Sequence, residues 1–139
     1  MLRIELLDWE KARAEASRIR FVVFVEEQRV PLEMELDELD PQCVHALAFS
    51  REGVPVATGR LLPDAHFGRM AVLKAWRGQG IGGAILERLV AAAGARGERE
   101  VALSAQTHAL DFYRRHQFKD EGDTYLDAGI PHRMMRRLL

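Results

Sequence analysis

The chain has 139 residues, a formal net charge of −1 and 47% hydrophobic residues. This size predicts one domain spanning residues 1–139, because two halves would each be too small to bury a core of their own. The nearly neutral charge argues against general nucleic-acid binding, for which a basic excess is typical. Cys43 is the only cysteine, so no disulfide can form within the chain.

The predicted elements begin with a strand at residues 1–8, whose apolar and polar residues alternate. This segment lacks the apolar core of a signal peptide, and no stretch reaches the roughly 18 apolar residues of a membrane span. We therefore expect a cytoplasmic protein with no membrane partner.

Asp8 is a good N-cap for a helix whose small and apolar residues keep helical spacing as far as Gln28, before Pro31. An acidic loop follows. The remaining pattern predicts strands at 44–51, 54–62 and 67–73, a helix at 81–95, a strand at 100–105, a helix at 108–116 and strands at 118–127 and 131–138. Strands interrupted by helices in this order indicate a mixed α/β sheet with crossover connections.

A glycine-rich loop stands between the apolar strand at 70–73 and the helix at 81–95. Its residues are Arg77, Gly78, Gln79, Gly80, Ile81, Gly82 and Gly83. Main-chain N–H groups of such a turn, together with the free N–H groups and positive dipole end of the following helix, form a site for a pyrophosphate. The helix is amphipathic, since Ile81, Ile85, Leu89 and Ala93 recur every four residues.

Two common phosphate-loop patterns do not fit these glycines. A Walker loop needs a Lys after its last glycine, and a dinucleotide loop needs Gly-x-Gly-x-x-Gly. The pattern here, Arg-x-x-Gly-x-Gly, resembles the acyl-CoA loop of the GNAT superfamily of N-acetyltransferases.

A second segment, from Ala109 through Phe112 and Tyr113 to Phe118, resembles the other GNAT signature. The resemblance implies that Tyr113 lies beside the CoA sulfur and protonates the departing thiolate; a phenol is a suitable acid for this step. The other interpretation of Phe112 and Tyr113 is a core-facing pair on a short helix. Two residues depart from the family pattern: Thr107 stands where Asn is common, and Gln117 stands where Gly usually ends the helix.

A third resemblance covers both ends of the chain. The run from Arg20 to Gln28 and the C-terminal sequence around Gly129-Ile130-Pro131-His132 are similar to a subgroup of small bacterial GNAT proteins. Together, the three segments cover most of the chain.

The resemblance implies the GNAT acyl-CoA N-acyltransferase fold, a mixed central sheet splayed between its fourth and fifth strands with flanking helices. It further implies an acetyl-CoA-dependent N-acetyltransferase in which a primary amine attacks the thioester directly. The cofactor-binding residues would be the backbone of Met70, Ala71 and Val72 for pantetheine, Arg77 to Gly83 for the pyrophosphate, and Tyr113.

The acceptor site and the general base are less closely specified. Between residues 26 and 40 the chain carries seven carboxylates and one cation, Arg29. Such a segment can attract a cationic small-molecule amine, or it can be a solvated loop. Glu27, Gln28, Glu35 and Asp37 match the subgroup pattern and are the candidate acceptor-binding residues. Glu35 and His132 are the candidate bases, although a histidine in that turn can also be purely structural.

Several further expectations follow. No spacing of His, Cys and carboxylates indicates a metal site. Arg133, Arg136 and Arg137 are expected to pair with the acidic segment of the same molecule or of a second subunit in a homodimer. Two other functions remain open: an acyl-CoA-binding regulator or assembly subunit with little turnover, and a nucleotide-binding module that uses the same loop.

Overall fold

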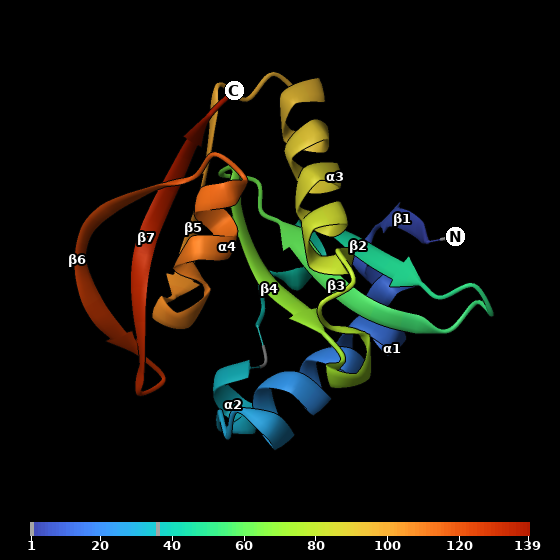
Figure 1. The fold of residues 1–139 in the computed structure, drawn as a ribbon. Coiled ribbons are helices and arrows are strands. Elements are labelled where there is room, and N and C mark those ends of the chain that lie inside the picture. Colours follow the sequence, from blue (N-terminus) through green and yellow to red (C-terminus); the bar gives the residue numbers. More distant parts are fainter. Residues whose placement is uncertain (1, 36) are drawn as a thin grey trace.

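The computed structural model describes residues 2–35 and 37–139. Its seven described strands form one sheet in the order β1-β2-β3-β4-β5-β7-β6 (Figure 1). The strands are β1 (Arg3–Leu7), β2 (Val44–Phe49), β3 (Pro55–Leu61), β4 (His66–Val72), β5 (Glu100–Gln106), β6 (Lys119–Asp127) and β7 (Ile130–Leu138). The α-helices are α1 (Trp9–Arg20), α2 (Leu32–Glu35), α3 (Ile81–Ala95) and α4 (Leu110–Arg115).

The sheet consists of two antiparallel halves that meet at a short parallel contact between β4 and β5. Only His66 with Ala102 and Phe67 with Leu103 are paired there, whereas β4 continues to Val72 and β5 to Gln106. The two strands therefore separate after Phe67, as Figure 1 shows. This confirms the expected mixed sheet that is splayed between its fourth and fifth strands.

Helices cover both faces of the sheet, and the alternation of side chains along β2 decides which residues meet which helix. Leu47 packs in the cluster of α1, whereas Ala46 and Ala48 pack in the larger cluster of α3. The buried stripe of α3 is the one predicted from its four-residue spacing: Ile81, Ile85, Leu86, Leu89, Val90 and Ala93. Figure 1 shows α3 and α4 on the same side of the sheet.

The N-terminal helix is capped as predicted, since the Asp8 side chain accepts a hydrogen bond from the Lys11 N–H. It differs from the prediction in its second part, η1 (Phe21–Glu27), which is a π-helix. There the Gln28 N–H donates to the Val23 carbonyl, five residues earlier. Such segments are rare and occur frequently at functional sites, because the extra residue redirects the side chains that follow.

The helix predicted at 108–116 is shorter than expected. A 3₁₀ turn occupies Thr107–Ala109, and α4 begins at Leu110. At its end, Gln117 takes a left-handed conformation with φ of 71°. Gln117 thus adopts the geometry that glycine supplies more easily, and the N–H of Phe118 donates to the Tyr113 carbonyl.

Among the described residues, no helix is both long and apolar enough to cross a membrane.

Candidate active site

The glycine loop leads directly into the N-terminus of α3. Gly78 and Gly80 have φ values of 77° and 81°, and Gly80 is the N-cap of the helix. No atom lies within 4 Å of the position that a Cβ would take at either glycine. The N–H groups of this turn and of the first helical residues therefore lie at an open surface, which suits the phosphates of CoA.

Beside the loop, β4 is free of β5 from Gly68 onward. The backbone of Met70, Ala71 and Val72 lies along this free edge, where the extended pantetheine chain of CoA can add as a further strand. This free edge ends at the glycine loop, so the two together fit CoA, whose pantetheine chain leads to a pyrophosphate. The chain as described holds no group of three His, Cys, Asp or Glu side chains arranged for a metal ion.

Arg77 is anchored on two sides. Its Nε donates to the Val72 carbonyl at 2.9 Å, and its two terminal nitrogens donate to the carboxylate of Glu27 at 2.6 and 2.8 Å. The hydrogen bond from Arg77 lowers the pKa of Glu27. Glu27 was expected to bind the acceptor, but the structure places its carboxylate at the cofactor loop.

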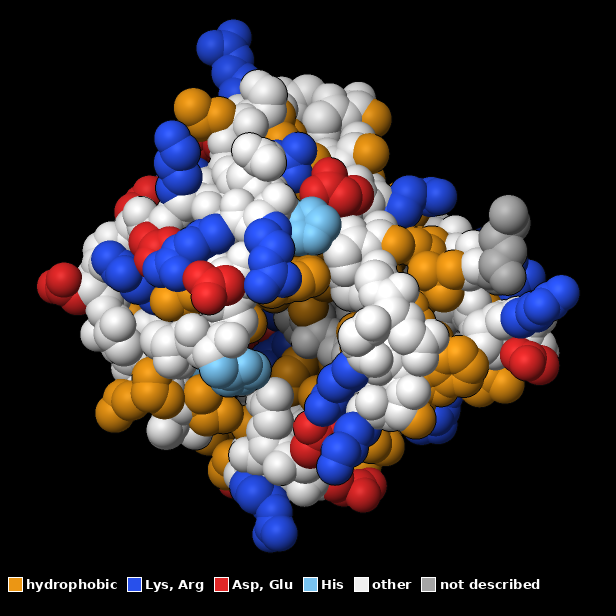
Figure 2. All heavy atoms as spheres, in the orientation of Figure 1, with side chains coloured by type: hydrophobic (Ala, Val, Ile, Leu, Met, Phe, Trp, Pro, Cys, Tyr) orange, Lys and Arg blue, Asp and Glu red, His pale blue; other side chains and the backbone are white. Residues whose placement is uncertain are grey.

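Two cavities meet at the splayed strands. The larger, about 1130 Å³, extends over the glycine loop, α3 and α4; the smaller, about 400 Å³, lies among η1, β4, β5 and β7. Figure 2 shows a hollow near the middle of this face, with histidine side chains at its rim. We call the larger the cofactor cavity and the smaller the acceptor cavity.

Tyr113 lines both cavities, as do Met70, Gln28 and Gln106. The amide of Gln106 donates to the Gln28 side chain at 2.8 Å and so links β5 to η1 across the junction. Gln28 was a predicted acceptor residue, whereas nothing in the sequence pointed to Gln106.

The ring of Tyr113 packs edge-on against Phe112 and Phe118. Burial raises the pKa of the Tyr113 phenol to about 12. The hydroxyl therefore carries its proton throughout the physiological pH range, as a general acid must.

His132 lines the acceptor cavity, and 9% of its surface is exposed. Its Nδ1 lies 2.7 Å from the carbonyl of Ile130, so Nδ1 carries the proton and donates it there. In the neutral ring this leaves Nε2 as the proton acceptor. The Tyr125 ring stacks against the imidazole, with 6.1 Å between the ring centroids.

The acidic segment differs most from expectation. The carboxylate of Glu35 is buried and accepts from Arg20 at 2.5 Å, and that of Asp37 accepts from Arg60 at 2.5 Å and Arg69 at 3.3 Å. Neither residue lines the acceptor cavity. The reason is electrostatic: buried carboxylates require cationic partners, and arginines from α1, β3 and β4 supply them.

The C-terminal arginines also have other partners than expected. Arg133 pairs with Asp120 and Arg137 with Glu87, and Arg136 pairs with Glu100 and Glu121. The expectation that they neutralise the acidic segment of the same molecule was wrong, because β7 lies between β5 and β6 and its arginines find carboxylates on β5, β6 and α3.

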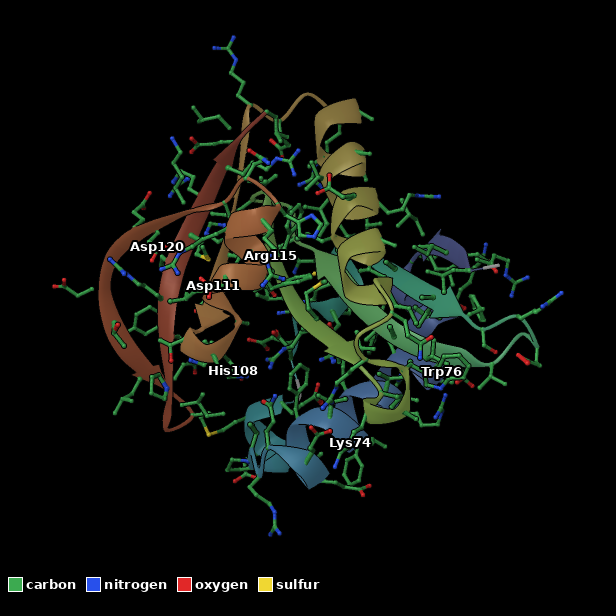
Figure 3. The ribbon with its side chains drawn as sticks, viewed as in Figure 1. Lys74, Trp76, His108, Asp111, Arg115 and Asp120 are labelled. Atoms are coloured by element: carbon green, nitrogen blue, oxygen red, sulfur yellow. The ribbon has the colours of Figure 1, made fainter. Side chains whose placement is uncertain are left out.

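The two arginines of α4 face different surroundings. Arg114 is held between Asp111 and Asp120, whereas Arg115 lines the cofactor cavity. Figure 3 shows Arg115 on the side of α4 that faces α3, with Asp111 and Asp120 on the other side. Of the two arginines, Arg115 is thus the one that lines the cofactor cavity.

Sequence reasoning missed Arg60 and Arg69, which line the acceptor cavity. A signal was present at Arg60, since a charged residue inside an otherwise buried strand needs a partner or a ligand.

The comparisons with known proteins agree with this geometry. The family model described as an acetyltransferase (GNAT) domain matches residues 12–139. The uncharacterized N-acetyltransferase YjcF of Bacillus subtilis is 39% identical over 132 residues, which cover 92% of this chain and 94% of that protein.

Solved structures resemble the chain over nearly its whole length. An acyl-CoA N-acyltransferase from Pseudomonas aeruginosa is 34% identical, with a TM-score of 0.82 and coverage of 99% of this chain and 98% of that one. A GNAT family acetyltransferase from Elizabethkingia anophelis, solved with acetyl-CoA bound, is 14% identical with a TM-score of 0.74, covers 99% and 98%, and shares the fold.

Proposed function

Because this chain belongs to the GNAT acetyltransferase family, we propose that it transfers the acetyl group of acetyl-CoA to a primary amine by direct attack in a ternary complex. One observation carries the proposal: Tyr113 lines both cavities, while His132 lines the acceptor cavity alone. This arrangement supports Tyr113 as the acid at the junction of the two cavities and His132 as the base on the acceptor side.

Each part of the site has a separate task. The open N–H groups around Gly78 and Gly80 and the N-terminus of α3 hold the pyrophosphate, and the free edge of β4 aligns the pantetheine chain. Arg115 adds a positive charge at the same cavity. In this proposal, a backbone N–H group on the free edge of β4, between Met70 and Val72, polarises the thioester carbonyl.

The proton transfers follow from the two side chains. His132 Nε2 takes a proton from the acceptor ammonium, and the neutral nitrogen then attacks the carbonyl carbon. The carbon–sulfur bond breaks, and the Tyr113 hydroxyl gives its proton to the sulfur. The proton that the new amide nitrogen loses restores the phenol, and His132 releases its proton to water, so the products are an N-acetyl amine, CoA thiol and a proton.

Two measurements test this function. Isothermal titration should detect acetyl-CoA binding, and a thiol assay should detect steady release of CoA that depends on added amine. Binding without amine-dependent release over a broad amine panel would contradict the enzyme and favour an acyl-CoA-binding regulator. Protection from heat by ATP or NAD, but not by acetyl-CoA, would instead favour a nucleotide-binding module.

A further inference from the structure

The wall of the acceptor cavity carries two arginine side chains with unused donors. Arg60 and Arg69 both line the cavity, and the Nε atom of each is buried without a hydrogen-bond partner among the described residues. Arg60 as a whole is 6% exposed. A buried N–H group without an acceptor is costly, and more so in a charged guanidinium, so these two atoms call for a ligand.

Both terminal nitrogens of Arg60, and Nη2 of Arg69, already donate hydrogen bonds. Arg60 donates through Nη1 to Asp40 at 2.8 Å and through Nη2 to Asp37 at 2.5 Å, and Arg69 donates through Nη2 to Asp37 at 3.3 Å. These bonds fix the guanidinium groups in position. Their Nε edges are therefore held in place before any ligand arrives, which reduces the entropic cost of binding.

Gly68 lies next to one of the two donors. It lines the same cavity, and a Cβ at this position would lie 3.7 Å from the Nε of Arg60. A Cβ there would occupy the space beside the donor that a ligand atom needs. Gly68 thus leaves space for a ligand atom beside Arg60.

The charges around the cavity are separated along the sheet. Arg60 and Arg69 come from β3 and β4, whereas His132 and Asp127 come from β7 and the end of β6, beyond β5. Asp127 is the only carboxylate among the described residues that line the cavity. The cavity therefore has a side with two arginines, whose guanidinium groups also pair with Asp37 and Asp40, and a side with the proposed base and a carboxylate.

We propose that the acceptor is a zwitterionic amine whose carboxylate accepts hydrogen bonds from the Nε–H groups of Arg60 and Arg69. Its ammonium then lies toward His132 and Asp127. This inference rests on the proposed function, since it names the acceptor class for the same site. Charge-assisted hydrogen bonds of this type are about twice as strong as neutral ones, so the carboxylate decides which amines are selected.

Matched acceptors test the proposal by turnover. Glycine, β-alanine and γ-aminobutyrate are each compared with the corresponding carboxamide, which keeps the carbonyl and removes the charge. We expect at least one amino acid to exceed its carboxamide about tenfold or more in kcat/KM. Equal values for all three pairs, or a preference for the carboxamides, would overturn the proposal.

Two variants and one control locate the effect. Arg69→Gln should remove most of the preference for the carboxylate and leave the KM for acetyl-CoA unchanged. Gly68→Ala should raise the KM of the amino acid by crowding Arg60. Arg13→Gln removes an exposed positive charge on α1 outside the cavity and should leave the preference intact. If both Arg69→Gln and Gly68→Ala keep the parent's preference for the amino acid over its carboxamide, the carboxylate does not bind at Arg60 and Arg69.

A binding measurement keeps the proposal separate from turnover. In ¹⁵N-labelled protein saturated with CoA, the arginine Nε–H signals are followed while N-acetylglycine or N-acetylglycinamide is added. The signal that disappears in Arg69→Gln should shift with N-acetylglycine and not with its amide. Shifts without any turnover would support the carboxylate site and refute the proposed reaction, whereas no difference between the two compounds would refute the site.

Discussion

Arg77 and Glu27, fifty positions apart in the chain, form a two-pronged ion pair at the edge of the cofactor cavity. The pair joins the π-helical segment η1 to the glycine loop. It also places a negative charge next to the position proposed for the pyrophosphate.

Replacement of this carboxylate should strengthen cofactor binding. In Glu27→Gln the repulsion of the phosphates disappears and Arg77 becomes free to contact them, so we expect the Kd for acetyl-CoA to fall about threefold to tenfold, with a steeper salt dependence. Calorimetry at two salt concentrations measures this. The control Glu26→Gln removes the exposed neighbouring charge. A weaker affinity in Glu27→Gln alone would show that Glu27 instead positions Arg77 for binding.

The glycine loop gives a prediction with a matched control. Gly80→Val should abolish detectable acetyl-CoA binding, because the side chain covers the N–H groups and disfavours φ of 81°. Gly53 lies in the β2–β3 turn with nearly the same φ of 84° and equally open surroundings. Gly53→Val should lose a similar stability, about 1–2 kcal/mol, and bind acetyl-CoA normally. If Gly80→Val and Gly53→Val bind acetyl-CoA with equal affinity, the glycine loop is not the pyrophosphate site.

Tyr113→Phe tests the general acid. The ring contacts with Phe112 and Phe118 remain, so acetyl-CoA affinity should change little, while kcat falls about 10²-fold or more. Because the pKa of Tyr113 is raised to about 12, the phenol of the parent stays protonated and contributes no alkaline decline of kcat below about pH 11. An unchanged kcat with a good acceptor would mean that the thiolate leaves without help from Tyr113.

His132→Gln tests the base. The amide can still bond to the Ile130 carbonyl but cannot accept the proton, so kcat/KM for the amine should fall about 10²-fold. His66→Gln is the control, since His66 lies outside both cavities. If both variants behave like the parent across the pH range, the proton of the acceptor is removed by another group.

Asp37→Asn should lower stability in a pH-dependent way. Burial by itself raises the pKa of Asp37, but hydrogen bonds from the Leu39 N–H and Arg60 outweigh it and lower the pKa from 3.8 to about 2. The carboxylate thus contributes stability above about pH 4, and this contribution is lost between about pH 4 and pH 2.

We expect Asp37→Asn to cost about 1–2 kcal/mol in urea unfolding at pH 7 and progressively less as the pH approaches 2. The control is Glu38→Gln, an exposed carboxylate on the same loop. A cost in Asp37→Asn that is independent of pH would show that packing, and not the charge, is what Asp37 contributes.

The sequence predicted most of what depends on local spacing. The four-residue repeat in α3, the Asp8 cap and the glycine turn each rest on a few neighbouring residues, and all three are present. Predictions of Tyr113 and His132 as site residues rested on resemblance to the family, and their chemical roles stay predictions. The π-helical geometry of η1 was not visible, because its apolar residues satisfy a helical pattern equally well.

Charge composition by itself misled for the acidic segment. Counted along the sequence, this segment of fifteen residues has seven carboxylates and one arginine, which indicates a strong negative charge. In the folded chain Arg20, Arg60, Arg69 and Arg77, from distant elements, hold Glu35, Asp37, Asp40 and Glu27.

What the sequence by itself determined is therefore the fold class, the glycine turn before α3 and the family. Only the tertiary structure decided which charges neutralise one another and which side chains face the acceptor, as with the unused Nε atoms of Arg60 and Arg69. The physical reason is range: helix spacing and turn geometry act between residues a few positions apart, whereas ion pairs and cavities join residues that only strand pairing and helix packing bring together.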